Sequence, residues 1–187
     1  MFLQMTTLGY GLLLPTFVQI VLKQPATDAG VVLLPGAIVG AVFAPIGGLI
    51  LDRLGAKKPI ILGLCGSFIA TFCFLFFFKN LTYQSCILFY FIYSLGIGLI
   101  VGNTMTSAMS YLPKNLQADG NATLQTLMQL SGGIGTSTIL AFVQQETNLY
   151  DGTIRGALFV LIFLMFNINI VILSQYFAFK GGKKNEF

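Results

Sequence analysis

The sequence contains no histidine and no tryptophan, and it has only ten basic and six acidic residues in a length of 187. Charged residues make up 9% of the chain, whereas a typical soluble domain has about 25%. Hydrophobic residues make up 56%, and the mean hydropathy is +0.85. A soluble domain of this size could not bury so much apolar surface. The composition therefore excludes a soluble protein and predicts one that lies in the lipid bilayer.

Cysteine is also scarce, and its positions give no support for a metal or redox site. Cys65, Cys73 and Cys86 all lie inside apolar runs, where they are expected to act as small buried hydrophobic residues. There is no Cys-x-x-Cys pair and no Cys/His cluster. We also find no nucleophile–base pair and no phosphate-binding loop. The sequence thus predicts no catalytic residue, no metal and no cofactor, and its scattered basic residues do not indicate a nucleic-acid partner.

Long apolar runs dominate what is present. A helix needs about 20 apolar residues to cross a bilayer, and the connections between the runs are too short for a soluble domain. We therefore predict an all-α membrane protein whose residues 1–187 form a single unit of six transmembrane helices. The expected spans are residues 2–22, 30–51, 59–78, 83–111, 121–144 and 157–179.

The basic residues predict how these spans are oriented. If the loop from Asp52 to Lys58 is cytoplasmic, alternation of the spans puts seven basic residues on the cytoplasmic side and three on the other. This bias follows the positive-inside rule. Both ends of the chain are then expected in the cytoplasm, with the protein in the plasma membrane. The cytoplasmic set is Arg53, Lys57, Lys58, Lys114, Lys180, Lys183 and Lys184, and the opposite set is Lys23, Lys79 and Arg155.

One stretch, GLILDRLGAKK, concentrates charge between the second and third spans. Its pattern is given by Gly48, Asp52, Arg53, Gly55, Lys57 and Lys58. This pattern resembles the loop signature of the major facilitator superfamily, which joins the second and third helices of a six-helix half on the cytoplasmic side. The resemblance implies one half of a facilitator fold and a latch that stabilises one state of the transport cycle. The alternative is a plain basic loop that only sets topology.

Further stretches resemble one branch of that superfamily, the 14-helix drug:proton antiporters of the EmrB/QacA type, and most of all the lincomycin-resistance exporters. They include Leu14-Pro15, Gly96-x-Gly98, Thr104-x-Thr106, Leu112-Pro113-Lys114 and Gln129 to Thr136. The resemblance covers the chain only as the last six helices. It implies the C-terminal half of a proton-driven multidrug exporter that works by alternating access with an absent N-terminal half. The chain departs from many relatives at Met128, where they have arginine.

Two groups of residues inside the spans are candidates for a functional role. Polar side chains within a membrane usually face protein or a water-filled cavity. The candidates for a substrate cavity are Gln4, Thr7, Asn103, Ser107, Gln125 and Gln129, with hydrogen bonds between helices as the alternative. Small residues let helices approach closely, and the candidates for packing are Gly36, Gly40, Ala44, Gly98, Gly102, Gly132 and Gly135. Met105, Met109 and Met128 are expected in core packing, or as a soft cavity lining.

Titratable groups are missing from the interior of the predicted spans. All six acids lie in loops, at helix ends or in the tail, and proton coupling needs such a group at membrane depth. We therefore expect the coupling carboxylate in the other half, and no transport by this half alone. Uncharged walls favour a small lipophilic or cationic substrate. A transporter of another cargo and a six-helix scaffold that dimerises without transport remain alternatives.

Overall fold

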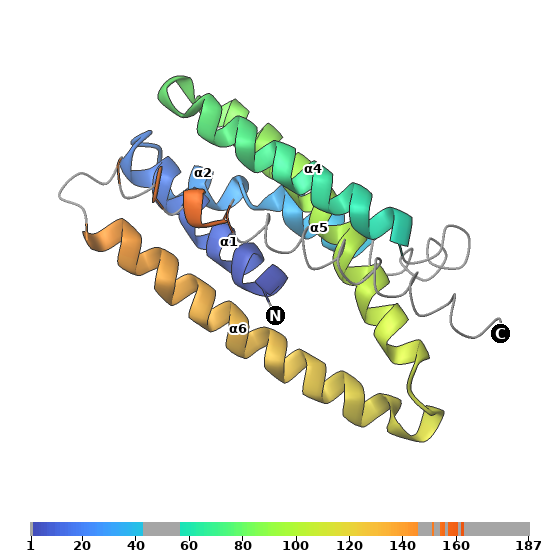
Figure 1. The fold of residues 1–187 in the computed structure, drawn as a ribbon. Coiled ribbons are helices and arrows are strands. Elements are labelled where there is room, and N and C mark those ends of the chain that lie inside the picture. Colours follow the sequence, from blue (N-terminus) through green and yellow to red (C-terminus); the bar gives the residue numbers. More distant parts are fainter. Residues whose placement is uncertain are drawn as a thin grey trace.

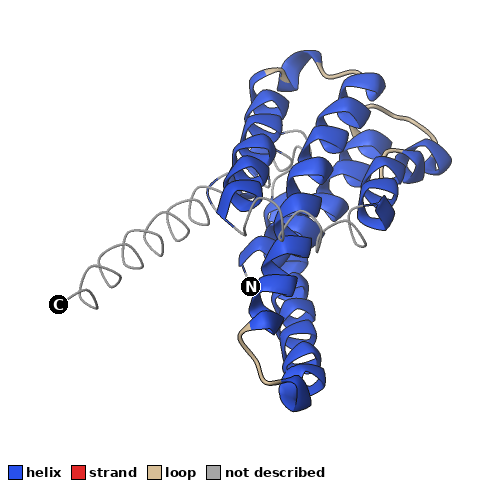
Figure 2. Ribbon diagram, turned by 90° about the vertical axis from the view of Figure 1, so that its right-hand side faces the viewer, coloured by secondary structure: helices blue, strands red, loops and turns tan. Residues whose placement is uncertain are grey.

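The computed structural model of the chain describes residues 2–42 and 57–145, together with 151, 154–155, 157–160 and 162. These residues form helices joined by short connections, and no strand occurs among them (Figures 1 and 2). The helices are α1 (Phe2–Ile20), α2 (Ala26–Val31), α4 (Lys57–Phe76), α5 (Tyr83–Ser110) and α6 (Gln117–Gln145). Single 3-10 turns, Phe78–Asn80 and Lys114–Leu116, precede α5 and α6. The predicted all-helical class is confirmed for this part of the chain.

Four of the helices match predicted spans closely, but six spans are not confirmed. The bounds of α1, α4 and α5 differ from the predicted ones by two residues or fewer, while α6 begins four residues before its predicted start. Within the described residues, two helical stretches are long and apolar enough to cross a membrane, Lys58–Phe76 and Tyr83–Ser110. The many Gln, Ser and Thr residues of α6 make it much less apolar than these two.

The second predicted span, residues 30–51, is interrupted. Helix α2 ends at Val31, a turn follows at residues 32–33, and residues 34–42 are again helical. Pro35 contributes to the break, because it has no backbone N–H to donate to the backbone oxygen of Val31, four positions earlier. Residues 43–56 lie outside the described part, and Ala44, Gly48, Asp52, Arg53 and Gly55 are among them. Most of the sixth predicted span lies outside it as well.

The helices pack as two close pairs, α1 with α6 and α4 with α5 (Figure 1). Glycine makes both contacts close. A Cβ atom on Gly63 of α4 would meet the backbone oxygen of Gly96 in α5, and a Cβ atom on Gly135 of α6 would meet the backbone of Met5 in α1. Gly132 lies against the side chain of Leu8 in the same way. Close approach at small residues is the usual basis of helix association in membranes.

Aromatic side chains join the two pairs to each other. The Tyr10 ring of α1 lies 4.7 Å from that of Tyr93 in α5 and 5.7 Å from that of Phe74 in α4. Further along, the Phe17 ring lies 5.8 Å from Phe74 and 5.0 Å from Phe78. These separations are typical of favourable aromatic contacts. The contact between pairs is therefore densest towards the end at which α1 and α4 terminate.

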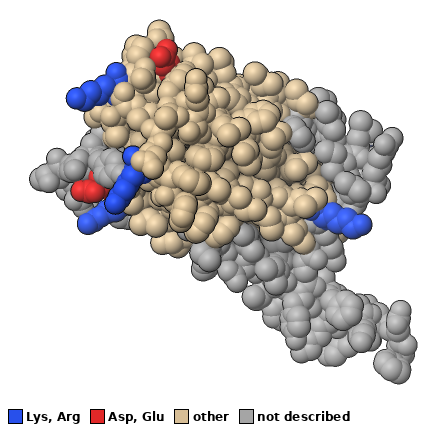
Figure 3. Space-filling view, turned by 90° about the horizontal axis from the view of Figure 1, so that it is seen from above, with Lys and Arg blue, Asp and Glu red and all other residues tan. Residues whose placement is uncertain are grey.

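Charged side chains gather near the two ends of the bundle and leave an uncharged band between them (Figure 3). Lys23 follows α1 and Lys79 follows α4 at one end, while Lys58 begins α4 and Lys114 precedes α6 at the other. This grouping of helix ends agrees with the prediction that successive connections lie alternately at the two ends of the bundle. Which end faces the cytoplasm stays a prediction.

Candidate functional site

A hollow of about 540 Å³ lies between α1, residues 34–42, α5 and α6. We call it the polar hollow, because amides, hydroxyls and tyrosine rings contribute to its wall beside glycine and apolar side chains. Its polar side chains are Gln4, Thr7, Tyr90, Tyr93, Ser94, Thr106 and Gln125. No charged side chain lines it among the described residues. Its volume lies in the range of small-molecule sites.

Three of the six residues predicted for a substrate cavity meet in this hollow. Gln4 and Thr7 reach it from α1, and Gln125 reaches it from α6. The Thr7 hydroxyl donates to the backbone oxygen of Leu3 at 2.8 Å, so its oxygen is left to act as a hydrogen-bond acceptor. The hollow thus brings together side chains that lie more than a hundred positions apart in the sequence.

The other three predicted residues do not line the polar hollow. Asn103 is fully buried, and its Nδ2 donates to the backbone oxygen of Leu99 at 2.7 Å. Ser107 is half-buried on α5, and Gln129 is exposed on α6. A step of four residues turns a helix by about 40° beyond a full turn. Gln129 therefore lies on nearly the same face of α6 as Gln125, one turn further along the helix and beyond the lining of the hollow.

Four glycines predicted for helix packing lie in the wall of the hollow, namely Gly36, Gly40, Gly98 and Gly102. Gly36 makes room for a tyrosine, since a Cβ atom there would lie 2.9 Å from Cε1 and 3.0 Å from the hydroxyl of Tyr90. A Cβ atom on Gly40 would meet nothing within 4 Å. Small residues at these positions therefore leave space inside the bundle.

Tyrosine hydroxyls give the wall unused hydrogen-bonding capacity. The ring of Tyr93 lines the hollow, and its hydroxyl is directed to the side chains of Thr6 and Thr7. Within the described residues, neither the Tyr93 nor the Tyr10 hydroxyl makes a hydrogen bond of good geometry. Buried polar atoms usually have a partner. Small rearrangements here would therefore gain hydrogen bonds, whether from Thr6 and Thr7 or from a bound molecule.

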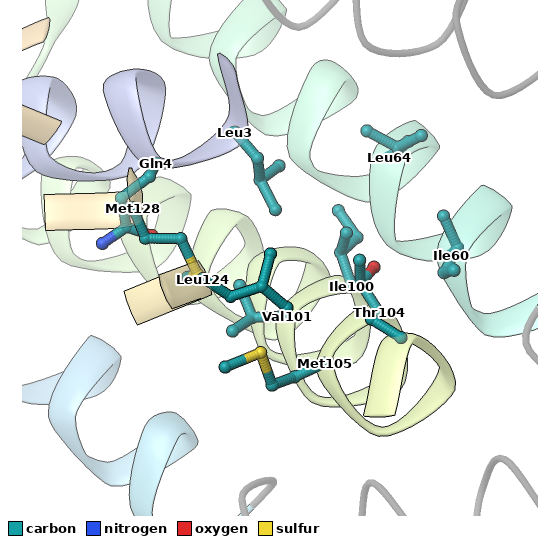
Figure 4. Close-up of a pocket in the computed structure, with 11 residues that line it drawn as sticks. Leu3, Gln4, Ile60, Leu64, Ile100, Val101, Thr104, Met105, Leu124 and Met128 are labelled. Carbon is teal, nitrogen blue, oxygen red and sulfur yellow. The ribbon is translucent and has the colours of Figure 1, made fainter. Parts of the chain in front are cut away.

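A second hollow of about 310 Å³ adjoins the first and is bounded by α1, α4, α5 and α6 (Figure 4). We call it the apolar hollow, because its wall is mostly hydrocarbon. Its own lining is Leu3, Ile60, Leu64, Ile100, Thr104, Ala108 and Leu124. It shares Gln4, Val101, Met105 and Met128 with the polar hollow. The two hollows therefore lie next to each other, with these four side chains between them.

Sequence reasoning missed the tyrosines and underrated the methionines. Tyr90, Ser94, Gly98, Val101 and Met105 recur on α5 every three or four positions, which places them on one helix face. That spacing is the signal that could have found them. Met105 and Met128, expected first in core packing, line both hollows.

The arrangement has the character of a binding site more than of a reaction centre. In the described part of the chain, no group of three or more His, Cys, Asp or Glu residues is placed to hold a metal ion. Among the acids described there, Asp119 and Asp151 are exposed and Asp28 is half-buried in α2. None of them lines either hollow.

Comparison with known proteins identifies the family. The model of the Major Facilitator Superfamily matches residues 1–136. The chain is 34% identical over 138 residues to the uncharacterized MFS-type transporter YhcA of Bacillus subtilis, covering 74% of the chain and 26% of that protein. It is 32% identical over 156 residues to the lincomycin resistance protein LmrB of the same organism, covering 81% of the chain and 32% of the relative. The lincomycin resistance protein LmrB of Listeria innocua is 30% identical over 152 residues, covering 81% of the chain and 32% of that protein.

The chain spans only about a quarter to a third of the length of these relatives. The match nevertheless extends over most of the chain and includes the helices that form both hollows. The chain therefore belongs to the Major Facilitator Superfamily of membrane transporters.

Proposed function

We propose that the chain forms the C-terminal part of a transporter that exports small lipophilic or cationic molecules across the plasma membrane. The observation that carries this proposal is the polar hollow, in which Gln4, Thr7 and Gln125 converge from α1 and α6 on a space of about 540 Å³. Substrate sites of secondary transporters lie between helices near the middle of the membrane, where alternating access exposes them to each side in turn.

The chemistry of the wall supports this class of substrate. Amides and hydroxyls orient a ligand by hydrogen bonds, and aromatic rings such as those of Tyr90 and Tyr93 can attract a cation that lies over a ring face. An anionic substrate would find no counter-charge among the described lining residues. Because relatives in Bacillus and Listeria are named for lincomycin resistance, lincomycin is the first compound to test.

We propose two partners for the chain, the lipid bilayer and an N-terminal transporter half. The outer face of α4 supports the first, since Leu62, Ile69, Phe72 and Phe76 are each more than half exposed. The N-terminal half is supported by the comparison with relatives, because the chain covers only 26% of YhcA and 32% of LmrB from Bacillus subtilis. In this proposal the proton gradient supplies the energy, and the coupling carboxylate belongs to the other half, because no acid lines either hollow in the described residues.

The charged signature from Gly48 to Lys58 is proposed to act as the latch between transport states. The described end of this segment supports that placement. Lys58 is exposed at the beginning of α4, at the same end of the bundle as Lys114. At that end, basic side chains would meet anionic lipid headgroups if the end is cytoplasmic.

An efflux assay tests the proposal. Cells lacking their own exporters would produce the chain alone, or the chain with the N-terminal part of LmrB from Bacillus subtilis, and lincomycin accumulation would be measured with and without a protonophore. We expect protonophore-sensitive export only from the co-expressing cells. Equal accumulation in all cells, with both polypeptides found in the membrane, would overturn the proposal. Export by the chain alone would show that it assembles with itself and would refute the need for another half.

A further inference from the structure

The apolar hollow is not accounted for by a single polar substrate site. It extends from α1 and α6 to Ile60 and Leu64 of α4, a helix that contributes nothing to the polar hollow. Figure 4 shows Ile60 and Leu64 on one side of this space and Gln4 and Met128 on the other, with Leu3 reaching in from α1. The apolar hollow therefore lies beside the polar hollow and extends towards α4.

Two methionines stand where the hollows meet. Met105 of α5 and Met128 of α6 line both spaces, together with Val101 and Gln4. Methionine is unbranched, has three rotatable side-chain bonds and adapts its shape to its surroundings at low cost. The two side chains are thus suited to act as an adjustable partition. Changes of their rotamers would widen or narrow the passage between the compartments without moving a helix.

We propose that the apolar hollow is a side pocket that holds the hydrocarbon group of an amphipathic ligand while the ligand's polar or cationic group lies in the polar hollow. This inference rests on the proposed function, because it assumes that the polar hollow binds the substrate. The two hollows are adjacent and share four lining residues, which supports a single ligand that spans both spaces once the two methionine side chains open a passage. Because the wall of one hollow is polar and that of the other is mostly hydrocarbon, the ligand is expected to have one polar and one apolar end.

Size and chemistry favour hydrocarbon in the side pocket. Gln4 and Thr104 are the polar side chains of its lining, and Leu3, Ile60, Leu64, Ile100 and Leu124 supply most of the rest. Such a wall offers few partners for water, which needs two to four hydrogen bonds in a buried site. Each methylene group transferred from water into apolar surroundings strengthens binding about fourfold, as follows from about 0.8 kcal/mol per group.

A series of probes with one head group and increasing chain length tests the pocket. Alkyltriphenylphosphonium ions, from methyl to decyl, would be titrated against the full chain in lipid nanodiscs, with binding to empty discs subtracted. In the unaltered chain we expect affinity to rise about fourfold per methylene and then to level off when the pocket is full.

Two substitutions should change, in opposite directions, the chain length at which affinity levels off. Ala108 and Leu124 line the apolar hollow only. Ala108→Leu adds three carbon atoms to the pocket and should bring the plateau about three methylenes earlier, while Leu124→Ala removes three and should delay it. Ala141→Leu is the matched control, since Ala141 is exposed on α6 and lines neither hollow. Affinity for the methyl probe should stay within about twofold in all four proteins, which also reports that they are folded.

The outcomes separate this inference from the proposed function. If the methyl probe binds but the plateau lies at the same chain length in every protein, the side pocket is refuted and the polar site stands. Affinity that does not depend on chain length in the unaltered chain would place a lipid chain in the hollow and also refute the pocket. If no probe binds the unaltered chain, both the pocket and the proposed polar site are refuted.

Discussion

Gly63 of α4 and Gly96 of α5 face each other so closely that the backbone oxygen of each lies where a Cβ atom of the other would be. Ser67, one turn after Gly63, adds to this contact, because its Oγ would also meet a Cβ atom on Gly96. The absence of side chains at two positions therefore sets the separation of α4 and α5. These two helices carry one wall of the apolar hollow.

Replacing Gly96 by alanine should destabilise the protein. The new Cβ atom would collide with the backbone of Gly63, which cannot move without separating α4 from α5. Overpacking of this kind costs about 1–3 kcal/mol. Thermal unfolding in detergent, followed by circular dichroism, would show a lower midpoint. Gly66→Ala is the matched control, since a Cβ atom there meets nothing within 4 Å, and a loss of equal size in the control would contradict this account.

Ser67 should couple to Gly96 in a double-mutant cycle. The Ser67 hydroxyl donates to the backbone oxygens of Gly63 at 2.9 Å and Tyr93 at 3.3 Å, and such a bond between helices contributes about 0.6 kcal/mol. Ser67→Ala alone should therefore have a small effect on the free energy of unfolding. In the double variant the loss should be less than the sum of the two single losses, because one colliding atom is gone. Additive losses would show that Ser67 Oγ takes no part in the collision.

Three neighbouring glycines of α6 should differ in their tolerance of alanine. A Cβ atom on Gly135 would meet the backbone of Met5, one on Gly132 would meet the movable end of Leu8, and one on Gly133 would meet nothing within 4 Å. Backbone cannot give way as a side chain can. Gly135→Ala should thus cost the most, about 1–3 kcal/mol, Gly132→Ala less and Gly133→Ala least. Measured unfolding midpoints in any other order would mean that α1 and α6 do not pack as described.

Gln125 and Gln129 should differ in their effect on ligand binding. Both were predicted to face a substrate cavity and both are exposed, but Gln125 lines the polar hollow and Gln129 does not. Gln125→Leu removes a hydrogen-bonding group and should weaken binding of lincomycin about twofold to tenfold, corresponding to about 0.5–1.5 kcal/mol. Gln129→Leu serves as the control and should leave the dissociation constant unchanged. The reverse order would place the ligand one turn further along α6, at Gln129.

Asp52→Asn should impair transport without impairing insertion. The proposed latch requires the charge of Asp52, whereas membrane topology depends mainly on Arg53, Lys57 and Lys58. Efflux by cells that also produce the N-terminal half should fall at equal amounts of protein in the membrane. Unchanged efflux would leave the segment with a topological role only.

Hydropathy predicted α4 and α5 well, since their apolar runs are long and end at loop residues such as Lys79 and Asn80. It placed the beginning of α6 too late. The helix already includes Ala118, Asp119 and Gly120, and the Asp119 carboxylate is favourable in a first turn, near the positive end of the helix dipole. The break after α2 was also missed. Predicting it would have required giving more weight to Pro35 than to the apolar residues around it. Charge and hydropathy thus located helices better than they located helix ends.

The site was harder to predict than the fold, because its wall depends on how each helix is rotated. Helical spacing grouped Gln125 with Gln129 and Asn103 with Ser107, yet packing separates the first two and buries Asn103. Gly36 was expected to bring helices together, and it does so by admitting the Tyr90 side chain next to the polar hollow. Tertiary contacts of this kind leave no trace in the spacing of one segment.

The aromatic contacts between the helix pairs lie towards one end of the bundle, and this has a mechanical consequence. Phe17, Phe74 and Phe78 close the seam between the pairs where α1 and α4 terminate, whereas Leu3, Ile60 and Leu64 border open space near the beginnings of the same helices. Two helix pairs that are in contact at one end separate most at the other end when the angle between them increases. If the two helix pairs rotate against each other about this end, the volume of both hollows varies with the angle between the pairs.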